Sequence, residues 1–397
     1  MRSIMLKSSL LATGFLFAVS LTAQKAVQPN FASISNKVVN QSLQVKPGET
    51  ILITGTPAEI PLMEALYVEV SKAGGQPVVQ LNLPNAGKKA LMETPVQYLK
   101  MPNTFSLIQM RAVDGVINTG STLDPKLFAD VPEDKIAAAR SGSYVLQDAM
   151  NLPRFRMVSI GQTGGIPTET FAKFKNASYD DMMNMFWKSV DVDYDKLRTE
   201  GESIRTTFKD NAEVKVTTPE GTNLTFHLSK MAPRINSGLS HGNNPTFSGM
   251  TAAWLPAGEV YAPVEASSAN GTLVAPEIDI RGQVIKNLRL KFTNGRITDI
   301  QADNNVNFVK TLLSSAKGDA DMLSLFDIGI NRSSQPLQNS SYYSWEMGGM
   351  VTLSTGDNAW AGGTTKSDVG LSFHIPGATV TINGKPVVEK GKLLEKY

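Results

Sequence analysis

The sequence predicts two domains: an α/β N-terminal domain built on a parallel sheet, followed by a β-rich α+β C-terminal domain. Two observations lead to this fold class. Between residues 48 and 83, an apolar strand, a helical stretch and a second strand follow one another, which is a βαβ unit and requires parallel strands. From residue 211 onward, apolar and polar residues alternate with period two, and turn-forming residues separate the runs, as in antiparallel hairpins. A chain of 397 residues is long enough for two such domains.

The first domain begins with the βαβ unit, whose helix is closed by Gly74 and Gly75. Two later apolar runs have the composition of buried strands, and a polar-faced helical segment then leads to the second domain. In order, the predicted elements are strand 50–54, helix 58–72, strand 77–83, strand 114–120, strand 156–160 and a helical connection over 179–209. We place the domain boundary near residue 205, so that the first domain covers residues 24–205.

The second domain, residues 206–397, consists mainly of predicted hairpins. Asn294-Gly295 and Asn383-Gly384 are dipeptides that favour the tight turns of hairpins, and residues 219–221 mark a third turn. The paired strands are predicted as 213–217 with 224–228, 288–292 with 297–300, and 378–382 with 387–388. One helix, residues 305–316, interrupts them.

Residues 1–23 have the pattern of a secretory signal peptide. Arg2 and Lys7 precede the uncharged apolar run 10–21, and small residues follow it up to Ala23. The alternative interpretation is a buried N-terminal helix. We expect cleavage after Ala23 and export to the periplasm or outside the cell. No membrane contact is expected afterwards, because no later run approaches the ~20 apolar residues of a membrane span.

Composition excludes several classes of chemistry. The chain has no cysteine, which rules out a thiol nucleophile, a thiolate zinc site and a redox pair. Its formal charge of +2 gives no reason to expect nucleic acid or an anionic membrane as a partner. The sequence contains neither the Gly-x-Ser-x-Gly element of serine hydrolases nor a phosphate-binding loop with its lysine.

Several segments resemble, in chain order, the thermophilic metalloaminopeptidase family of the aminopeptidase T type, which is leucyl aminopeptidase-like. The most specific is 255–263, Leu-Pro-Ala-Gly-Glu-Val-Tyr-Ala-Pro, which is similar to the family's Asn-Leu-Pro-Ala-Gly-Glu-Val motif. Residues 45–53 are similar to the family's opening strand and residues 217–224 to its domain junction. The resemblance implies an aminopeptidase T-like fold and a homodimer. It also implies that two divalent metals hydrolyse the N-terminal bond of peptides.

The resemblance further implies a set of metal ligands, namely two glutamates, two histidines, an aspartate and a tyrosine. Glu259 occupies the first glutamate position and Asp327 the second, so these two residues are the candidate metal ligands. The implied metal is zinc, cobalt or manganese. The remaining positions hold residues that bind divalent metals poorly or not at all, and these are Thr352, Gly370, Ser372 and a residue near Ala359. If these replacements abolish the site, no cofactor is expected.

The three histidines do not restore the ligand set by their positions. We expect His227 to point outward from a strand and His374 to lie at a strand end. His241, in a polar loop upstream of Glu259, is the candidate binding residue. Asp327 is flanked by apolar residues, and two environments remain open for it: a wet cleft, or a hydrogen bond from a neighbouring backbone amide.

A relocated metal site made only of oxygen ligands is a further hypothesis, and it would favour magnesium, calcium or manganese over zinc. Its candidate ligands are Glu259, Asp327, Glu346, Asp357 and Asp368. Two functions therefore remain. The first is a metal-dependent aminopeptidase that releases N-terminal amino acids from peptides. The second is a catalytically inactive family member that acts as a peptide-binding or interaction protein. No catalytic residue is assigned from the sequence.

Overall fold

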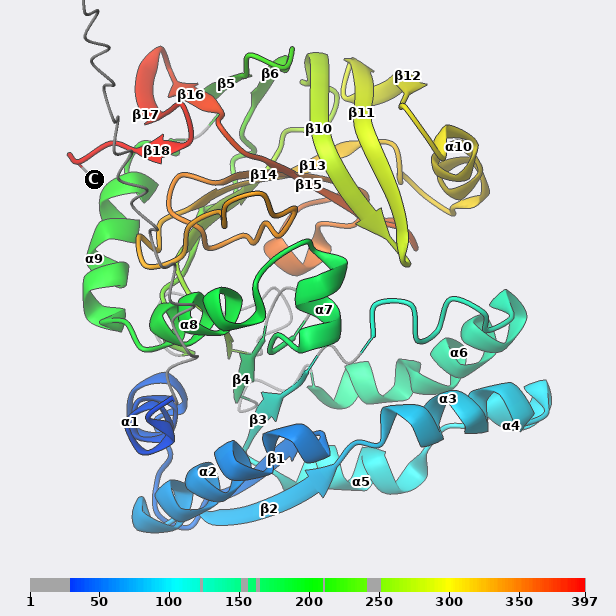
Figure 1. The fold of residues 1–397 in the computed structure, drawn as a ribbon, viewed down its shortest axis with the longest axis vertical. Helices are drawn as coiled ribbons and strands as arrows, with labels where there is room; N and C mark the ends of the chain where they lie inside the picture. The colour runs from blue at the N-terminus through cyan, green and yellow to red at the C-terminus, as the bar shows by residue number, and fades with distance from the viewer. Residues whose placement is uncertain are drawn as a thin grey trace, which may run out of the picture.

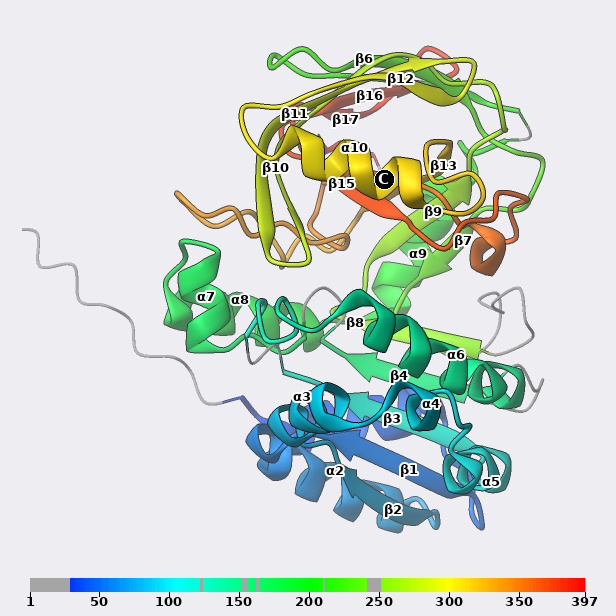
Figure 2. The same ribbon diagram turned by 90° about the vertical axis from the view of Figure 1, so that its right-hand side faces the viewer.

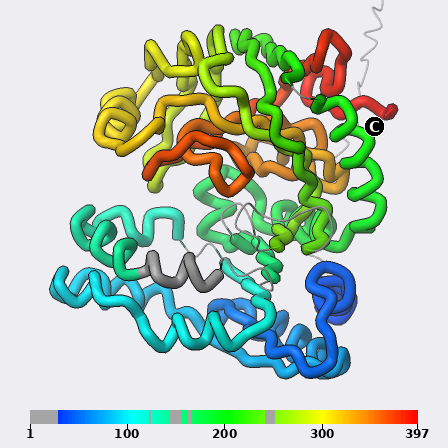
Figure 3. The backbone as a smooth tube through the Cα atoms, turned by 180° about the vertical axis from the view of Figure 1, so that it is seen from behind, coloured from blue at the N-terminus to red at the C-terminus, as the bar shows by residue number. Residues whose placement is uncertain are grey.

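The computed structural model describes residues 29–121, 124–150, 156–161, 165–209, 211–240 and 251–396. The predicted signal peptide and His241 lie outside these residues. The chain forms two stacked halves, with the earlier elements in the lower half and the later strands in the upper half (Figures 1 and 3). No described helix is long and apolar enough to cross a membrane.

The lower half is built on a five-stranded sheet in the order β2-β1-β3-β4-β8, and every neighbouring pair is parallel. The βαβ prediction is thereby confirmed, because β1 and β2 flank a 3-10 turn, Pro57–Glu59, and helix α2. The strands are β1 (Thr50–Gly55), β2 (Gln76–Leu81), β3 (Gly115–Thr119), β4 (Arg156–Ile160) and β8 (Thr251–Leu255). The helices around the sheet are α2 (Ile60–Lys72), α3 (Pro84–Glu93), α4 (Val96–Leu99), α5 (Thr104–Ala112) and α6 (Glu133–Met150).

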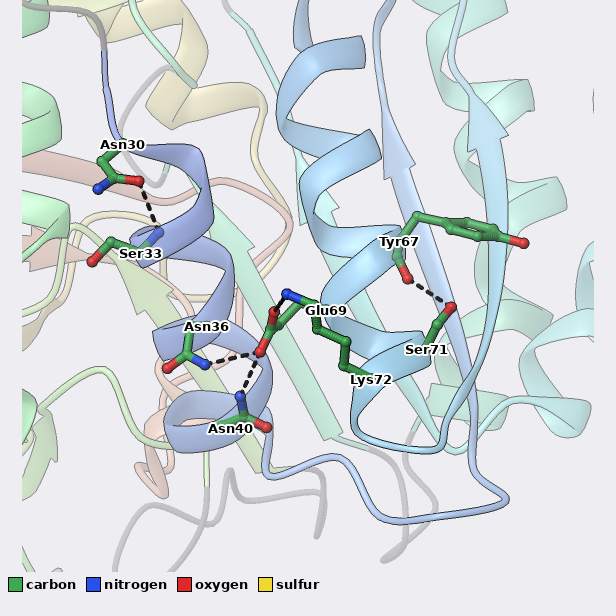
Figure 4. A network of polar contacts seen from close by, with 8 residues as sticks. All are labelled: Asn30, Ser33, Asn36, Asn40, Tyr67, Glu69, Ser71 and Lys72. Atoms are coloured by element: carbon green, nitrogen blue, oxygen red, sulfur yellow. Dashed lines mark hydrogen bonds and ion pairs between the residues drawn. The ribbon is translucent and has the colours of Figure 1, made fainter.

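A polar network fastens the first helical segment, α1 (Phe31–Lys37) with the π-helical turn Val38–Leu43, to helix α2 (Figure 4). The amides of Asn36 and Asn40 donate to one carboxylate oxygen of Glu69, at 2.8 and 3.0 Å. Lys72 contacts the other oxygen at 3.1 Å. Because its oxygens are hydrogen-bonded, the buried Glu69 carboxylate can lie between two helices without a large desolvation cost.

Three helices connect the halves: α7 (Glu169–Phe174), α8 (Tyr179–Val190) and α9 (Tyr194–Arg205). The side chains of Ser178 and Asp193 accept hydrogen bonds from backbone amides of the first turns of α8 and α9, which explains where these helices begin. The predicted helical connection is confirmed. The boundary near residue 205 stays a prediction, and the structure adds that β8, which follows it, returns to pair with β4 in the first sheet.

The upper half contains two antiparallel sheets, and its predicted hairpins and helix are confirmed. The larger sheet has the order β12-β11-β10-β6-β5-β16-β17-β18. Its strands are β5 (Glu213–Thr217), β6 (Asn223–His227), β10 (Asn270–Ile280), β11 (Gln283–Thr293), β12 (Arg296–Gln301), β16 (Thr379–Ile382), β17 (Lys385–Glu389) and β18 (Lys392–Leu393). Helix α10 spans Val306–Ser315.

The smaller sheet, in the order β15-β14-β13-β9-β7, is called the site sheet below. Its strands are β7 (Arg234–Asn236), β9 (Glu259–Pro263), β13 (Leu323–Gly329), β14 (Val351–Thr355) and β15 (Leu371–Ile375). It lies between the larger sheet and the lower half (Figure 2). One face packs on the larger sheet, where Phe326 contacts Phe226 and Phe208 with ring centroids 5.4 and 5.5 Å apart. Since side chains alternate along a strand, the neighbouring residues point to the opposite face.

Candidate functional site

A single row of side chains crosses the outer face of the site sheet. Strand register places Arg234 opposite Tyr261, Tyr261 opposite Asp327, Asp327 opposite Thr352, and Thr352 opposite His374. These residues come from five different strands, and they share one face because directly paired residues point the same way. The row therefore brings together Asp327, one of the sequence-predicted ligands, and Thr352, a position at which the family resemblance implies a ligand.

Glu259 joins this row from the diagonal position. It pairs with Gly329 on β13, two residues beyond Asp327, so the two carboxylates are diagonal neighbours on adjacent strands. The side chains of Glu259 and Asp327 both line a cavity of about 170 Å³, called the aromatic cavity below. Its lining residues are Trp254, Glu259, Tyr261, Asp327, Trp345 and Trp360. The structure thus brings the two predicted metal ligands together.

Two glycines fix the backbone around the carboxylates. Gly258 has φ +125°, and a Cβ on it would meet the backbone of Asn331, so the turn into β9 requires glycine. The Asn331 amide donates to the carbonyl oxygen of Ala257 at 2.7 Å, which holds this turn against the end of β13. A Cβ on Gly329 would meet the carbonyl oxygens of Trp345 and Met347. The absence of a side chain at Gly329 therefore lets this loop cross the sheet and places Trp345 over the cavity.

Asp327 is in an unfavourable environment for an isolated carboxylate. Asp327 is 1% exposed and Glu259 is 3% exposed. Neither carboxylate oxygen of Asp327 has a hydrogen-bond partner among the described residues. Burial, together with the nearby carboxylates of Glu259 and Glu346, raises the pKa of Asp327 well above its usual range. Of the two environments expected for Asp327, the structure shows the cavity and not a backbone hydrogen bond.

The hydroxyl groups on β14 and β15 hydrogen-bond with their neighbours on the sheet. Thr352 Oγ1 and His374 Nδ1 are 2.8 Å apart, and Ser354 Oγ and Ser372 Oγ are 3.0 Å apart. Within the described part of the chain, no three His, Cys, Asp or Glu side chains are grouped so that they could hold a metal ion. The Glu259–Asp327 pair can supply oxygen donors, but the described residues do not fit a two-metal centre.

The relocated all-oxygen site is not assembled in the described part of the chain. Among the described residues, the five carboxylates proposed for it do not form such a group. The Glu346 carboxylate accepts hydrogen bonds from the hydroxyls of Ser334, at 2.9 Å, and Ser344. Asp357 is exposed, and Asp368 accepts a hydrogen bond from the backbone amide of Lys317 at 2.7 Å. The Glu346 and Asp368 carboxylates are therefore engaged in hydrogen bonds of their local loops.

His374 lies near the end of strand β15, as expected, and it completes the row of side chains across the site sheet. Its ring meets that of Trp345 edge-on, with centroids 5.7 Å apart. Burial, with a smaller contribution from Lys175, lowers the pKa of His374 to about 4, so the imidazole is neutral at pH 7. A sequence signal did exist: His374 follows Ser372 by two residues, and residues two apart on a strand share a face.

A second cavity of about 500 Å³, called the wide cavity, adjoins the first. Trp345 lines both cavities. Gly370, Ser372 and His374 also line the wide cavity, so two positions at which the family resemblance implies metal ligands face open space. Lys175 and Arg281 are among its charged lining residues.

The other described histidine, His227, hydrogen-bonds through its ring to the carbonyl oxygen of Asn211 at 3.1 Å and lines neither cavity.

The aromatic residues were not predicted from the sequence. Trp254, Tyr261 and Trp360 form a contiguous wall, since Trp360 lies 6.3 Å from Trp254 and 5.6 Å from Tyr261 between ring centroids. Trp254 comes from β8 of the lower half, and Trp360 comes from the short helix Ala359–Ala361. No short motif contains these residues, because the fold assembles them from separate segments.

This geometry defines a two-domain protein with a buried acidic pair at the junction of a parallel α/β domain and a β-rich domain. The chain belongs to the thermophilic metalloprotease family (M29), whose family model matches residues 27–343. The family resemblance in the sequence is thereby confirmed. The match ends before β14 and β15, the strands that carry Thr352, Ser372 and His374. No curated protein matches the sequence.

Two solved structures share the fold. Wild-type AmpT from Thermus thermophilus superposes with a TM-score of 0.70 and 14% sequence identity, covering 92% of this chain and 99% of that chain. A 2,5-dihydroxypyridine dioxygenase from Pseudomonas putida KT2440 superposes with a TM-score of 0.58 and 14% identity, covering 92% and 97%. The predicted aminopeptidase T-like fold class is confirmed. Membership of a metallopeptidase family implies a divalent metal and peptide substrates for the family.

Proposed function

We propose that this protein is an exported member of the metallopeptidase family that binds peptides and does not hydrolyse them. The observation that supports this most directly is that the hydroxyl groups on β14 and β15 hydrogen-bond across the two strands, Thr352 with His374 and Ser354 with Ser372. Thr352 and Ser372 occupy implied ligand positions, and both are hydrogen-bonded to neighbouring side chains. Loss of a single metal ligand or supporting partner typically costs about 10–100-fold in affinity or activity. Replacement of several ligands therefore favours a binding protein.

The two adjoining cavities support the peptide ligand. A peptide is a chain of polar amides with apolar and charged side chains, and it needs an extended, mixed surface. The wide cavity offers aromatic rings such as Tyr343 and Trp345, together with the charges of Lys175 and Asp279. It continues into the aromatic cavity at Trp345. An extended peptide would lie along the wide cavity with one end at the acidic pair.

The metal-dependent aminopeptidase is the second candidate function. The observation that favours it is the burial of Glu259 and Asp327 side by side, because two buried carboxylates are strongly stabilised by a cation. These two residues would be the protein ligands contributed by the described chain. His241 lies outside the described residues, so its predicted binding role stays a prediction.

Metal content and hydrolysis together distinguish the two functions. The mature protein is incubated with zinc, cobalt or manganese, dialysed exhaustively, and analysed for bound metal. It is then tested for release of N-terminal amino acids and, by calorimetry, for binding of short peptides. We expect saturable peptide binding, no retained metal and no hydrolysis. One or two retained metals per chain, with hydrolysis abolished by Glu259→Gln, would establish the aminopeptidase instead.

Export and dimerisation are also part of the proposal. The pattern of residues 1–23 supports export, which mass spectrometry of the secreted or periplasmic protein would test through cleavage after Ala23. An exposed apolar surface supports a homodimer: Tyr67, Val68 and Val79 are each 47–51% exposed on α2 and the edge strand β2. We expect Val68→Glu to convert the dimer to a monomer in light scattering, whereas a monomeric parent protein would refute the homodimer.

A further inference from the structure

We infer that the aromatic cavity is a binding site for a primary alkylammonium group. The cavity combines three indole rings and one phenol ring with two buried carboxylates. Aromatic faces attract cations through the ring quadrupole, and carboxylates supply the opposite charge. A set of aromatic rings around acidic groups is therefore complementary to an organic cation. The inference deepens the proposed function, on which it rests for the source of the cation.

The buried acid decides the type of cation. Asp327 is 1% exposed and lines the cavity, and neither of its oxygens has a hydrogen-bond partner among the described residues. Leaving buried acceptors unbonded is costly, so a ligand that donates hydrogen bonds is favoured. A primary ammonium group carries three N–H donors, whereas a quaternary ammonium carries none. The unbonded oxygens of Asp327 therefore favour a primary ammonium group over a quaternary one.

The rings favour an organic cation over a bare metal ion. Three of the six lining residues are tryptophans, whose indole rings provide no metal ligand. Three of the four tryptophans in the chain lie here, from segments as distant as β8 and the short helix around Trp360. A volume of about 170 Å³ suits a small organic group, since an apolar cavity of ~150 Å³ admits benzene.

The walls of the cavity are fixed by hydrogen bonds. The amide of Asn236 donates to the carbonyl oxygen of Trp254 at 2.9 Å and accepts from its backbone N–H at 3.3 Å. The amide of Asn358, which precedes the helix with Trp360, donates to the carbonyl oxygen of Ser324 on β13 at 2.8 Å. Because these buried amides hold two of the aromatic segments in place, less ordering is required on binding.

Calorimetric titration with small amines tests the site without any peptide. We expect n-propylammonium to bind saturably and its neutral analogue n-propanol to bind at least 10-fold more weakly. Tetramethylammonium should also bind more weakly, because it has no N–H donor. Equal affinity for the amine and the alcohol would overturn the inference, as would tighter binding of tetramethylammonium. Zinc or manganese that binds tightly and excludes the amine would assign the cavity to a metal and overturn it too.

Two variants with matched controls locate the binding. Asp327→Asn keeps the side-chain shape and removes the charge, and Trp360→Leu removes a ring that is 42% exposed and whose loss the fold should tolerate. We expect each to weaken n-propylammonium at least 10-fold. Asp299→Asn and Phe105→Leu make matching changes at exposed positions and should leave the affinity unchanged. Unchanged affinity in both cavity variants would place the amine elsewhere and refute the site.

Peptides with free and acetylated N-termini separate this inference from the proposed function. If the N-terminal ammonium of a peptide is the natural cation, leucine amide and short peptides should bind, and acetylation should weaken them at least 10-fold. Amine binding without any peptide binding would refute the proposed function and leave the ammonium site standing. Peptide binding that acetylation does not change, with no amine binding, would refute the ammonium site and leave the peptide-binding function.

Discussion

The replacement His374→Asn should change how the stability of this protein depends on pH. Asn keeps a polar atom close to the position of Nδ1, so it can maintain the hydrogen bond with Thr352 that is 2.8 Å long in the structure. It removes the titratable ring that burial and Lys175 hold in the neutral form. The variant therefore isolates the ionisation of one side chain in the row that crosses the site sheet.

The expected magnitude follows from proton linkage. The pKa of His374 is about 4 in the folded protein, against a reference value of 6.5. A lowered pKa means that the unfolded chain binds the proton more readily, so stability is complete above about pH 6.5 and falls as the pH drops towards 4. Between pH 7.5 and 5.0 this single group would cost about 2 kcal/mol. The His374 side chain is partly exposed, so solvent screens part of this effect. We therefore expect a loss of stability of about 1–2 kcal/mol between these two pH values.

Urea denaturation of the wild-type protein and His374→Asn at pH 7.5 and 5.0 measures this effect. Asp327 and Glu346 have raised pKa values and change stability in the opposite direction, but both are present in the two proteins and cancel in the comparison. We expect the wild-type protein to lose about 1–2 kcal/mol more than the variant on acidification. Equal losses in the two proteins would show that His374 is not held neutral and would refute the reasoning.

Three further replacements test the site sheet by urea denaturation at pH 7. Asp327→Asn should raise the free energy of unfolding by about 1 kcal/mol, because it removes a buried charge without a described hydrogen-bond partner; a loss of stability would contradict this. Gly329→Ala should lower it by about 2–4 kcal/mol through collision with the carbonyl oxygens of Trp345 and Met347, and an unchanged value would mean that this loop moves freely. Thr352→Val should cost about 1–2 kcal/mol by leaving His374 without its partner, whereas Thr298→Val at an exposed position should have little effect.

Local sequence patterns predicted the secondary structure because the relevant forces are local. The βαβ unit around α2 and the hairpins at Asn294 and Asn383 depend on periodicity and turn geometry, which a short window of sequence contains. The pairing of β8 with β4 depends on contacts between distant segments. No local pattern distinguishes a strand that returns to the first sheet from one that stays in the second domain.

The candidate site was predictable only where a motif contains it. Glu259 lies in the Leu-Pro-Ala-Gly-Glu-Val segment, and Gly258 explains physically why that segment is restricted, since a side chain there would collide with Asn331. Asp327 could be aligned from the apolar strand around it. Trp254 and Trp360 enter the cavity from separate elements, so their proximity arises only from the tertiary fold. The position of His374 could have been predicted from Ser372, because residues two apart on a strand point to the same face.

The fold alone cannot decide the reaction. This chain is similar both to AmpT and to a dioxygenase, because each of these structures superposes on 92% of it at 14% identity. Function must therefore be argued from the side chains on the site sheet. Strand β13 contributes an acidic residue, Asp327, whereas β14 and β15 contribute hydrogen-bonded hydroxyls and one neutral imidazole. These two strands also follow residue 343, where the family match ends. The choice between an aminopeptidase and a peptide-binding protein consequently depends on the side chains that β14 and β15 contribute.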